Sequence, residues 1–101
     1  MSDKTTLIVT ATPNPSEMNA MQQYIGTVGP MLASIGGTVL KRLKVTDVFH
    51  GDEAFPVILV MEFPSKQSLS ELFNSADYQA IVPVRDRAFS QIKIMFAEDI
   101  V

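Results

Sequence analysis

The sequence contains no cysteine and no tryptophan, and its single histidine is His50. Without cysteine the chain cannot form a disulfide, supply a thiolate nucleophile, or hold an iron–sulfur cluster or a cysteine-based zinc site. One histidine among scattered carboxylates does not make a set of metal ligands either. We therefore expect no metal site and no bound cofactor.

Basic residues are also few, because 8 Lys and Arg stand against 11 Asp and Glu and give a net charge of −3. Lys41, Arg42 and Lys44 form the one basic cluster. Proteins that bind nucleic acid need a broad basic surface to neutralise many phosphates. We therefore expect no nucleic-acid partner.

Long hydrophobic runs are missing as well. No segment approaches the ~20 apolar residues that span a bilayer, and the apolar run near the N-terminus is too short for a secretory signal. These absences predict a cytoplasmic protein without a membrane partner. A chain of 101 residues has room for one core, so we expect one domain over residues 1–101.

The most informative segment that is present runs from Val57 to Met61 and is apolar at every position. Alternate residues of a strand point to opposite faces of a sheet, so both faces of this strand must be covered. A chain this short has enough helix to cover one face. This pattern predicts a homodimer in which a second copy covers the other face.

Periodicity and turn signals predict the order strand, helix, strand, strand, helix, strand. The expected elements are strands over residues 5–12, 38–49, 57–63 and 90–97, a helix from Ser16 to about residue 35, and helical segments from Ser65 to Pro83. Gly51-Asp52 predicts a hairpin between the two middle strands. This order is typical of a ferredoxin-like α+β fold, with an antiparallel sheet and both helices on one face.

Spacings of three and four predict which face of the first helix is buried. The stripe comprises Met18, Met21, Ile25, Val28, Leu32 and Ile35. Gly26, Gly29 and Pro30 should weaken or kink the second half of this helix, and Gly36-Gly37 should end it.

A set of residues in the second half of the chain resembles a known family. Glu62-Phe63-Pro64-Ser65 ends the apolar strand, and Ser75-x-x-Tyr78-Gln79 with a downstream Arg85 follows. Over about residues 36–88 this pattern resembles the family catalogued as domain of unknown function 1330. The resemblance implies a dimeric α+β barrel, in which two such sheets face each other; no catalytic residue is established for the family.

Three positions depart from that family pattern. Phe73 stands where members often have tyrosine, and Leu72 stands where an aromatic residue is common. His50 replaces a residue that is commonly acidic. The aromatic pair that family members offer to a site is therefore altered in this chain.

Tyr78 and Arg85 are the candidate ligand-binding residues. They are seven positions apart, so a continuous helix places them on nearly one face, with Pro83 between them. Arg85 could then bind a carboxylate while Tyr78 donates a hydrogen bond. The alternative is structural: Arg85 pairs with Asp77, Glu62 or the partner chain, and Tyr78 is a packing residue.

Glu62 and His50 are the candidate catalytic residues. Glu62 is the one carboxylate in an apolar strand, and burial would raise its pKa and suit it to acid–base chemistry. The alternative is a glutamate that reaches water or pairs with a basic residue. His50 lies beside a turn, where loops often carry function, and the alternative is a solvated loop residue. Ser65 and Ser75 read as helix caps because no base is spaced to activate either.

These observations predict a homodimer that binds or transforms a small carboxylate-bearing or aromatic molecule in a pocket between sheet and helices. The pocket is expected near Tyr78, Arg85 and Glu62, and whether the protein is an enzyme stays open. The alternative is a non-catalytic dimerising or stress-associated interaction module. A cavity of ~300 Å³ or more near Arg85 favours the first function, whereas a filled core and a paired Arg85 favour the second.

Overall fold

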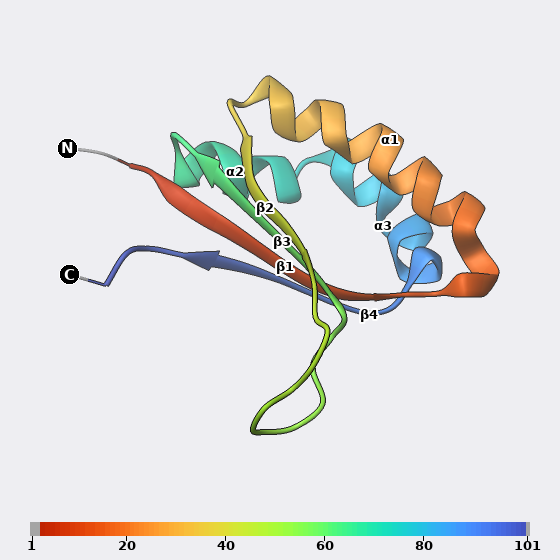
Figure 1. Ribbon diagram of the computed structural model, residues 1–101. Coiled ribbons are helices and arrows are strands. Elements are labelled where there is room, and N and C mark those ends of the chain that lie inside the picture. The colour runs from red at the N-terminus through yellow and green to blue at the C-terminus, as the bar shows by residue number, and fades with distance from the viewer. Residues whose placement is uncertain (1–2, 101) are drawn as a thin grey trace.

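The computed structural model describes residues 3–100 and shows one sheet with a layer of helices on one side (Figure 1). The elements in chain order are β1 (Thr5–Pro13), the short 3₁₀ helix η1 (Pro15–Glu17), α1 (Met18–Ser34), β2 (Thr38–Lys44), β3 (Val57–Phe63), α2 (Lys66–Phe73), α3 (Ala76–Ala88) and β4 (Phe89–Ala97). Among the described residues, no helix combines the length and apolar character needed to cross a membrane.

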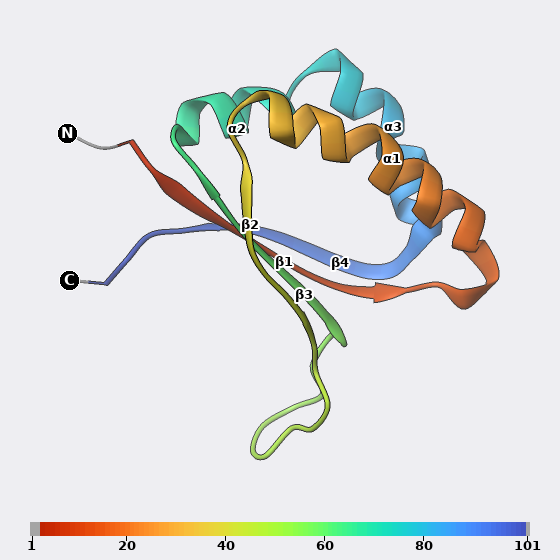
Figure 2. The same ribbon diagram turned by 45° about the horizontal axis from the view of Figure 1, so that its top comes forward.

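The sheet has four strands in the order β2-β3-β1-β4, and every neighbouring pair is antiparallel. All three α-helices lie on the same face, as Figures 1 and 2 show from two directions. The chain therefore has the ferredoxin-like α+β fold that the sequence predicts.

The core lies between the helices and the inner face of the sheet. Leu7, Phe63, Leu69 and Tyr78 are its largest fully buried side chains, and they come from β1, β3, α2 and α3. The register alternates these positions with residues that face away from the helices, including Ile8 opposite Val60. The apolar run of β3 therefore supplies both faces of the sheet, and within residues 3–100 no helix lies over the outer face.

The start and the buried face of α1 differ from the prediction. Asn14 accepts a hydrogen bond from the Ser16 backbone N–H at 3.0 Å, and the 3₁₀ turn that follows delays the α-helix to Met18. The predicted helix start at Ser16 is therefore wrong, because Asn14 followed by Pro15 caps a 3₁₀ turn and the α-helix begins after it.

The buried side chains of α1 are Ala20, Tyr24, Val28 and Leu32, which recur every fourth residue. The predicted stripe is therefore wrong at Met18 and Ile25, which are 46% and 57% exposed. Tyr24 occupies the buried face instead because its ring packs edge-on against Phe89 and its hydroxyl finds a partner inside the protein. The helix is continuous through Pro30.

The second helical region follows the predicted caps. The Ser65 and Ser75 hydroxyls accept hydrogen bonds from the backbone N–H groups of Ser68 and Tyr78 and so cap the N-termini of α2 and α3. Helix α3 continues through Pro83 to Ala88, further than predicted.

The second strand is shorter than predicted, because β2 ends at Lys44 rather than Phe49. Pairing with β3 stops where the Val45 N–H donates to the Pro56 carbonyl at 2.8 Å. Pro56 has no N–H to continue the ladder, so the chain leaves the sheet there. Residues 45–56, which we call the arm, project from the sheet on the side away from the helices (Figures 1 and 2).

Candidate functional site

A pocket of about 360 Å³ opens between α1 and the β2 edge of the sheet. Its apolar wall includes Val28 and Leu32 of α1 and Leu59 and Met61 of β3, and Gly29 and Gly37 also line it. Such a volume and lining are typical of a site for a small organic molecule. The pocket lies between sheet and helices, but Tyr78, Arg85 and Glu62, near which the sequence predicts it, are not among its lining residues.

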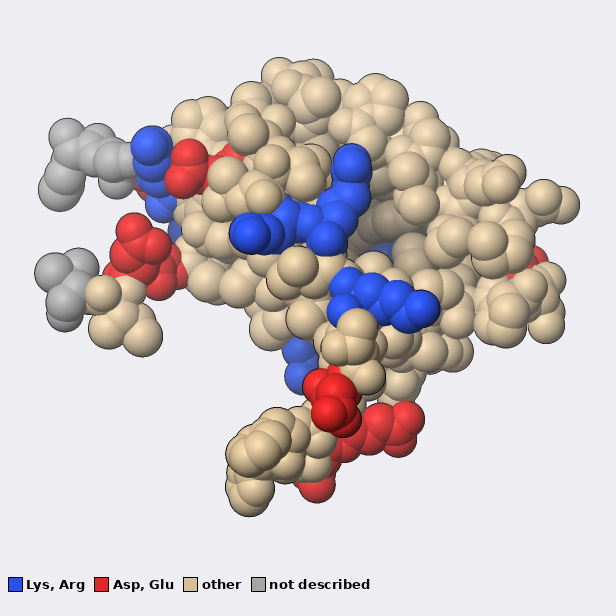
Figure 3. All heavy atoms as spheres, in the orientation of Figure 1, with Lys and Arg blue, Asp and Glu red and all other residues tan. Residues whose placement is uncertain are grey.

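Two polar side chains also line this pocket. Arg42 comes from the exposed edge strand β2, and Tyr24 comes from the buried face of α1. No hydrogen bond or ion pair engages the Arg42 side chain within residues 3–100. Figure 3 shows basic side chains gathered over the middle of this face, beside a hollow beneath α1. The pocket thus combines apolar walls with a free guanidinium on β2.

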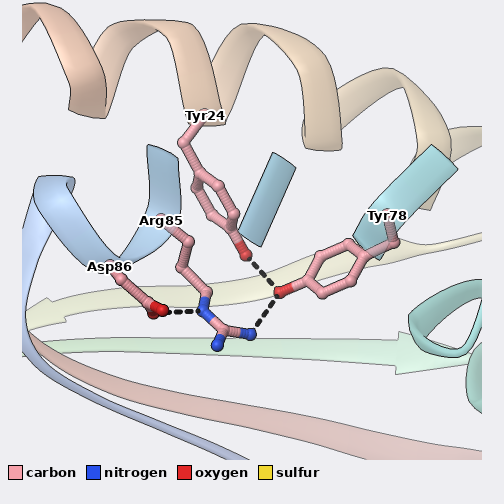
Figure 4. Close-up of polar contacts among 4 residues, drawn as sticks. All are labelled: Tyr24, Tyr78, Arg85 and Asp86. Atoms are coloured by element: carbon pink, nitrogen blue, oxygen red, sulfur yellow. Dashed lines mark hydrogen bonds and ion pairs between the residues drawn. The ribbon is translucent and has the colours of Figure 1, made fainter. Parts of the chain in front are cut away.

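Tyr24 also belongs to a polar network that is buried at Tyr24 and Tyr78 and exposed at Asp86, and Figure 4 shows it as a chain of contacts between α1 and α3. The Tyr24 and Tyr78 hydroxyl oxygens are 2.8 Å apart. Arg85 donates from Nη1 to the Tyr78 hydroxyl at 3.2 Å and from Nε to Asp86 Oδ1 at 3.2 Å. The structure therefore brings Tyr78 and Arg85 together across Pro83, as their spacing predicts.

The network raises the pKa of Tyr24 and the pKa of Arg85. Burial raises the pKa of Tyr24, and the contact with the Tyr78 hydroxyl raises it further. Burial alone lowers the pKa of Arg85, but its bonds to Tyr78 and Asp86 outweigh that effect and leave the pKa raised. Around neutral pH Tyr24 is therefore a neutral phenol and Arg85 a cation.

Arg85 has an ion-pair partner, but not all of its guanidinium N–H groups are engaged. Its partner is the neighbouring Asp86, rather than Asp77 or Glu62 as the structural alternative supposed. Two of the five guanidinium N–H groups are engaged within residues 3–100, which leaves three for a ligand or water. Arg85 does not line the 360 Å³ pocket. It is connected to the lining residue Tyr24 by hydrogen bonds that pass through Tyr78.

The structure separates the other two candidates from this network. Glu62 faces the outer side of the sheet, where its side chain is 45% exposed and lies 3.9 Å from the Lys4 ammonium. A single pocket therefore does not join Glu62 to Arg85 within this chain, because the sheet lies between them. His50 is exposed on the arm, on the opposite side of the sheet from the helices (Figure 1). Across residues 3–100, His, Asp and Glu side chains nowhere form a group of three that could hold a metal ion.

Sequence reasoning missed Tyr24 and Arg42 as site residues. Tyr24 lies four residues before Val28 and eight before Leu32, so a stripe drawn on i, i+4 spacing includes it. No pattern in the sequence indicates that Arg42 faces the helices, because a register shift between Val39 and Lys41 changes which residues of β2 do so. Phe73, where the family often has tyrosine, packs edge-on against Tyr78, with the two ring centroids 4.8 Å apart.

The model of the family described as domain of unknown function 1330 matches residues 5–100, so the chain belongs to this family. The match is wider than the resemblance over residues 36–88 and includes β1 and α1. Among curated proteins, none matches the sequence at a significant level.

Solved structures share the fold at low sequence identity. A protein of unknown function from Rhodopseudomonas palustris is 17% identical with a TM-score of 0.80, and the match covers 100% of this chain and 85% of that one. A dimeric ferredoxin-like protein of unknown function from Jannaschia sp. CCS1 is 14% identical with a TM-score of 0.69 over 95% and 99% of the chains. A candidate antibiotic biosynthesis monooxygenase from Nitrosomonas europaea is 11% identical with a TM-score of 0.67 over 98% and 92%.

Proposed function

We propose that this protein is a homodimer that binds a small, largely apolar molecule with a carboxylate in the pocket between α1 and the sheet. The observation that carries the proposal is the 360 Å³ apolar pocket with Arg42 and Tyr24 among its lining residues. Apolar walls supply affinity, while a few placed polar groups fix the orientation of a ligand. Tyr78 and Arg85 complete the site behind Tyr24.

Arg42 is the residue proposed to recognise the carboxylate. It has no partner within residues 3–100, and a guanidinium can bind both carboxylate oxygens at once. The apolar walls beside it would hold the body of the molecule. Naphthalene-2-carboxylate is a suitable probe because it combines a rigid apolar body with one carboxylate.

Replacing Arg42 by glutamine is expected to weaken binding of naphthalene-2-carboxylate about tenfold, because a charge-assisted hydrogen bond is lost. Isothermal titration calorimetry measures the change. Lys44→Gln is the matched control, since it removes the same charge from the same strand at a residue that does not line the pocket. Equal losses in the two variants would mean that the general charge of β2, rather than Arg42, attracts the probe.

Arg85→Ala tests the inner part of the site. If Arg85 serves the ligand, we expect binding of the same probe to weaken about threefold or more. The free energy of unfolding should change by about 1 kcal/mol, since one of the two lost hydrogen bonds is exposed and the other is partly buried. Asp86→Ala is the control, because it removes the ion-pair partner and keeps the guanidinium. A loss of several kcal/mol in stability with unchanged binding would make Arg85 structural and would favour the interaction-module alternative.

The homodimer is proposed to bury the outer face of the sheet. Ile8, Ile58, Val60 and Met95 point to that face, and no helix in the described part of the chain covers it. The structural neighbour from Jannaschia sp. CCS1 is described as dimeric, and so is one from Bacteroides fragilis. A second copy covering this face would remove the apolar side chains from water.

The arm supports the same assembly. It projects on the outer side of the sheet, and its Phe55 ring lies 5.9 Å from the Lys93 ammonium of β4. Phe49 is fully exposed, at 102%. A partner seated on the outer face would lie beside this arm and could cover Phe49.

A further inference from the structure

The hydrogen bonds of Tyr78 have a direction that its neighbours impose. Arginine is a donor only, so the Tyr78 oxygen must accept at its 3.2 Å contact with Arg85. Tyr78 is 2% exposed, and its hydroxyl has one other partner within residues 3–100, the Tyr24 oxygen at 2.8 Å. The Tyr78 proton can therefore be satisfied only by the Tyr24 oxygen.

The reverse arrangement is unfavourable. If Tyr24 donated to Tyr78, the Tyr78 oxygen would accept two bonds and its own proton would be left buried without an acceptor. A buried donor without a partner carries the full cost of its desolvation, which exceeds the gain from an ordinary hydrogen bond. When Tyr78 donates to Tyr24, the proton without a partner within residues 3–100 belongs instead to Tyr24, which lines the pocket and can meet water or a ligand there. The chain of donors therefore runs from Arg85 to Tyr78 and from Tyr78 to Tyr24.

At the end of this chain of donors the Tyr24 proton has no acceptor within residues 3–100, although Tyr24 is only 9% exposed. Tyr24 is also a wall residue of the 360 Å³ pocket. We infer that the Tyr24 hydroxyl is an obligate hydrogen-bond donor to the molecule in the pocket, which must carry an oxygen acceptor such as a ketone or carboxylate there. This inference rests on the proposed function and names the ligand group that the inner wall selects.

Two properties of the network strengthen this donor. Hydrogen bonds in a chain polarise one another, so the Arg85 cation at the start of the chain makes the Tyr24 hydroxyl a stronger hydrogen-bond donor. Burial and the Tyr78 contact raise the pKa of Tyr24, so the phenol still carries its proton at neutral pH. Tyr24 therefore acts as a positioning and specificity residue.

The test compares two probes of equal shape, 2-acetylnaphthalene and 2-isopropenylnaphthalene, which differ in that only the first has an oxygen acceptor. The preference is the affinity for the ketone divided by the affinity for the alkene. This ratio is expected to be about tenfold higher in wild type than in Tyr24→Phe, because that variant keeps the ring and loses the donor. The carbonyl stretching frequency of the bound ketone should be lowered in wild type and should return toward its apolar-solvent value in Tyr24→Phe.

Two further variants separate a role in binding from a role in folding. Tyr78→Phe keeps the Tyr24 donor and should keep the preference for the ketone, with a smaller frequency shift because the link to Arg85 is broken. The double variant Tyr24→Phe with Tyr78→Phe leaves no buried hydroxyl without a partner, so it tests the loss of preference even if Tyr24→Phe alone is unstable. Thermal unfolding of each variant shows whether the fold is kept.

The outcomes distinguish this inference from the proposed function. If both probes bind wild type but Tyr24→Phe and the double variant keep the same preference and carbonyl frequency, the donor role is overturned and the pocket stands. If neither probe binds wild type at millimolar concentration, the pocket proposal is overturned and the donor role with it. If Tyr24→Phe and the double variant lose the preference for the ketone but still bind the alkene, the result supports both the donor role and the pocket.

Discussion

Replacement of Val60 by lysine should cost several kcal/mol of stability and dissociate the proposed dimer. Val60 lies in the middle of the outer face, opposite Ile8 on β1 and Lys41 on β2. In a dimer that buries this face the new ammonium would lose its water without gaining an acceptor. It would also stand opposite Lys41, and like charges directly opposite each other destabilise a sheet.

The measurement combines light scattering with denaturant unfolding. Wild type at micromolar concentration should give twice the 11.1 kDa mass of one chain. Val57→Lys is the control, because Val57 begins the same strand at an exposed position that faces the other side. A wild-type mass of one chain, or a Val60→Lys variant no less stable than the control, would contradict the outer-face dimer.

Replacement of Gly37 by alanine should also destabilise the fold by about 1–3 kcal/mol, which is typical of overpacking. A Cβ atom at this position would lie 2.6 Å from Phe63 Cε2 and 2.8 Å from the Leu32 carbonyl oxygen. Phe63 is 0% exposed and cannot move aside without disturbing the core, and the Leu32 carbonyl accepts the Gly37 N–H at 3.0 Å. Gly37 is also a wall residue of the pocket, so probe binding should weaken with stability.

Gly26→Ala is the matched control for this substitution. Gly26 lies inside α1, and a Cβ atom there has nothing within 4 Å. Alanine favours a helix over glycine by up to about 1 kcal/mol, so this variant should be slightly more stable than wild type. Chemical denaturation measures the free energy of unfolding of both variants. Equal changes would show that the contact with Phe63 does not restrict the size of the side chain at residue 37.

The parts of the fold that depend on neighbours in the sequence were predictable. Ser65 and Ser75 cap the helices they precede because a short hydroxyl side chain reaches a backbone N–H three residues on. Gly36 ends the first helical region with a φ of 87°, which other residues rarely adopt. The spacing of Tyr78 and Arg85 likewise implied their contact, because α3 remains helical through Pro83.

The parts that depend on pairing between distant segments were not predictable. The length of β2 was overestimated because the limit comes from Pro56 on the partner strand, not from β2 itself. The buried face of α1 was drawn through Ile25 because hydrophobicity alone cannot show that Tyr24 meets a hydroxyl from α3. The interior position of Tyr24 depends on α3, which begins more than fifty residues later.

The sequence by itself determined the fold class, since strand and helix periods, caps and apolar runs are local properties of the chain. It also determined that β3 has two apolar faces, from which the dimer is proposed. Only the tertiary structure decided which polar groups meet, because the register of β2 sets the face of Arg42 and helix packing joins Tyr24 to Tyr78 and Arg85. Hydrogen bonds act over about 3 Å, so a site built from them exists only once the distant segments are packed.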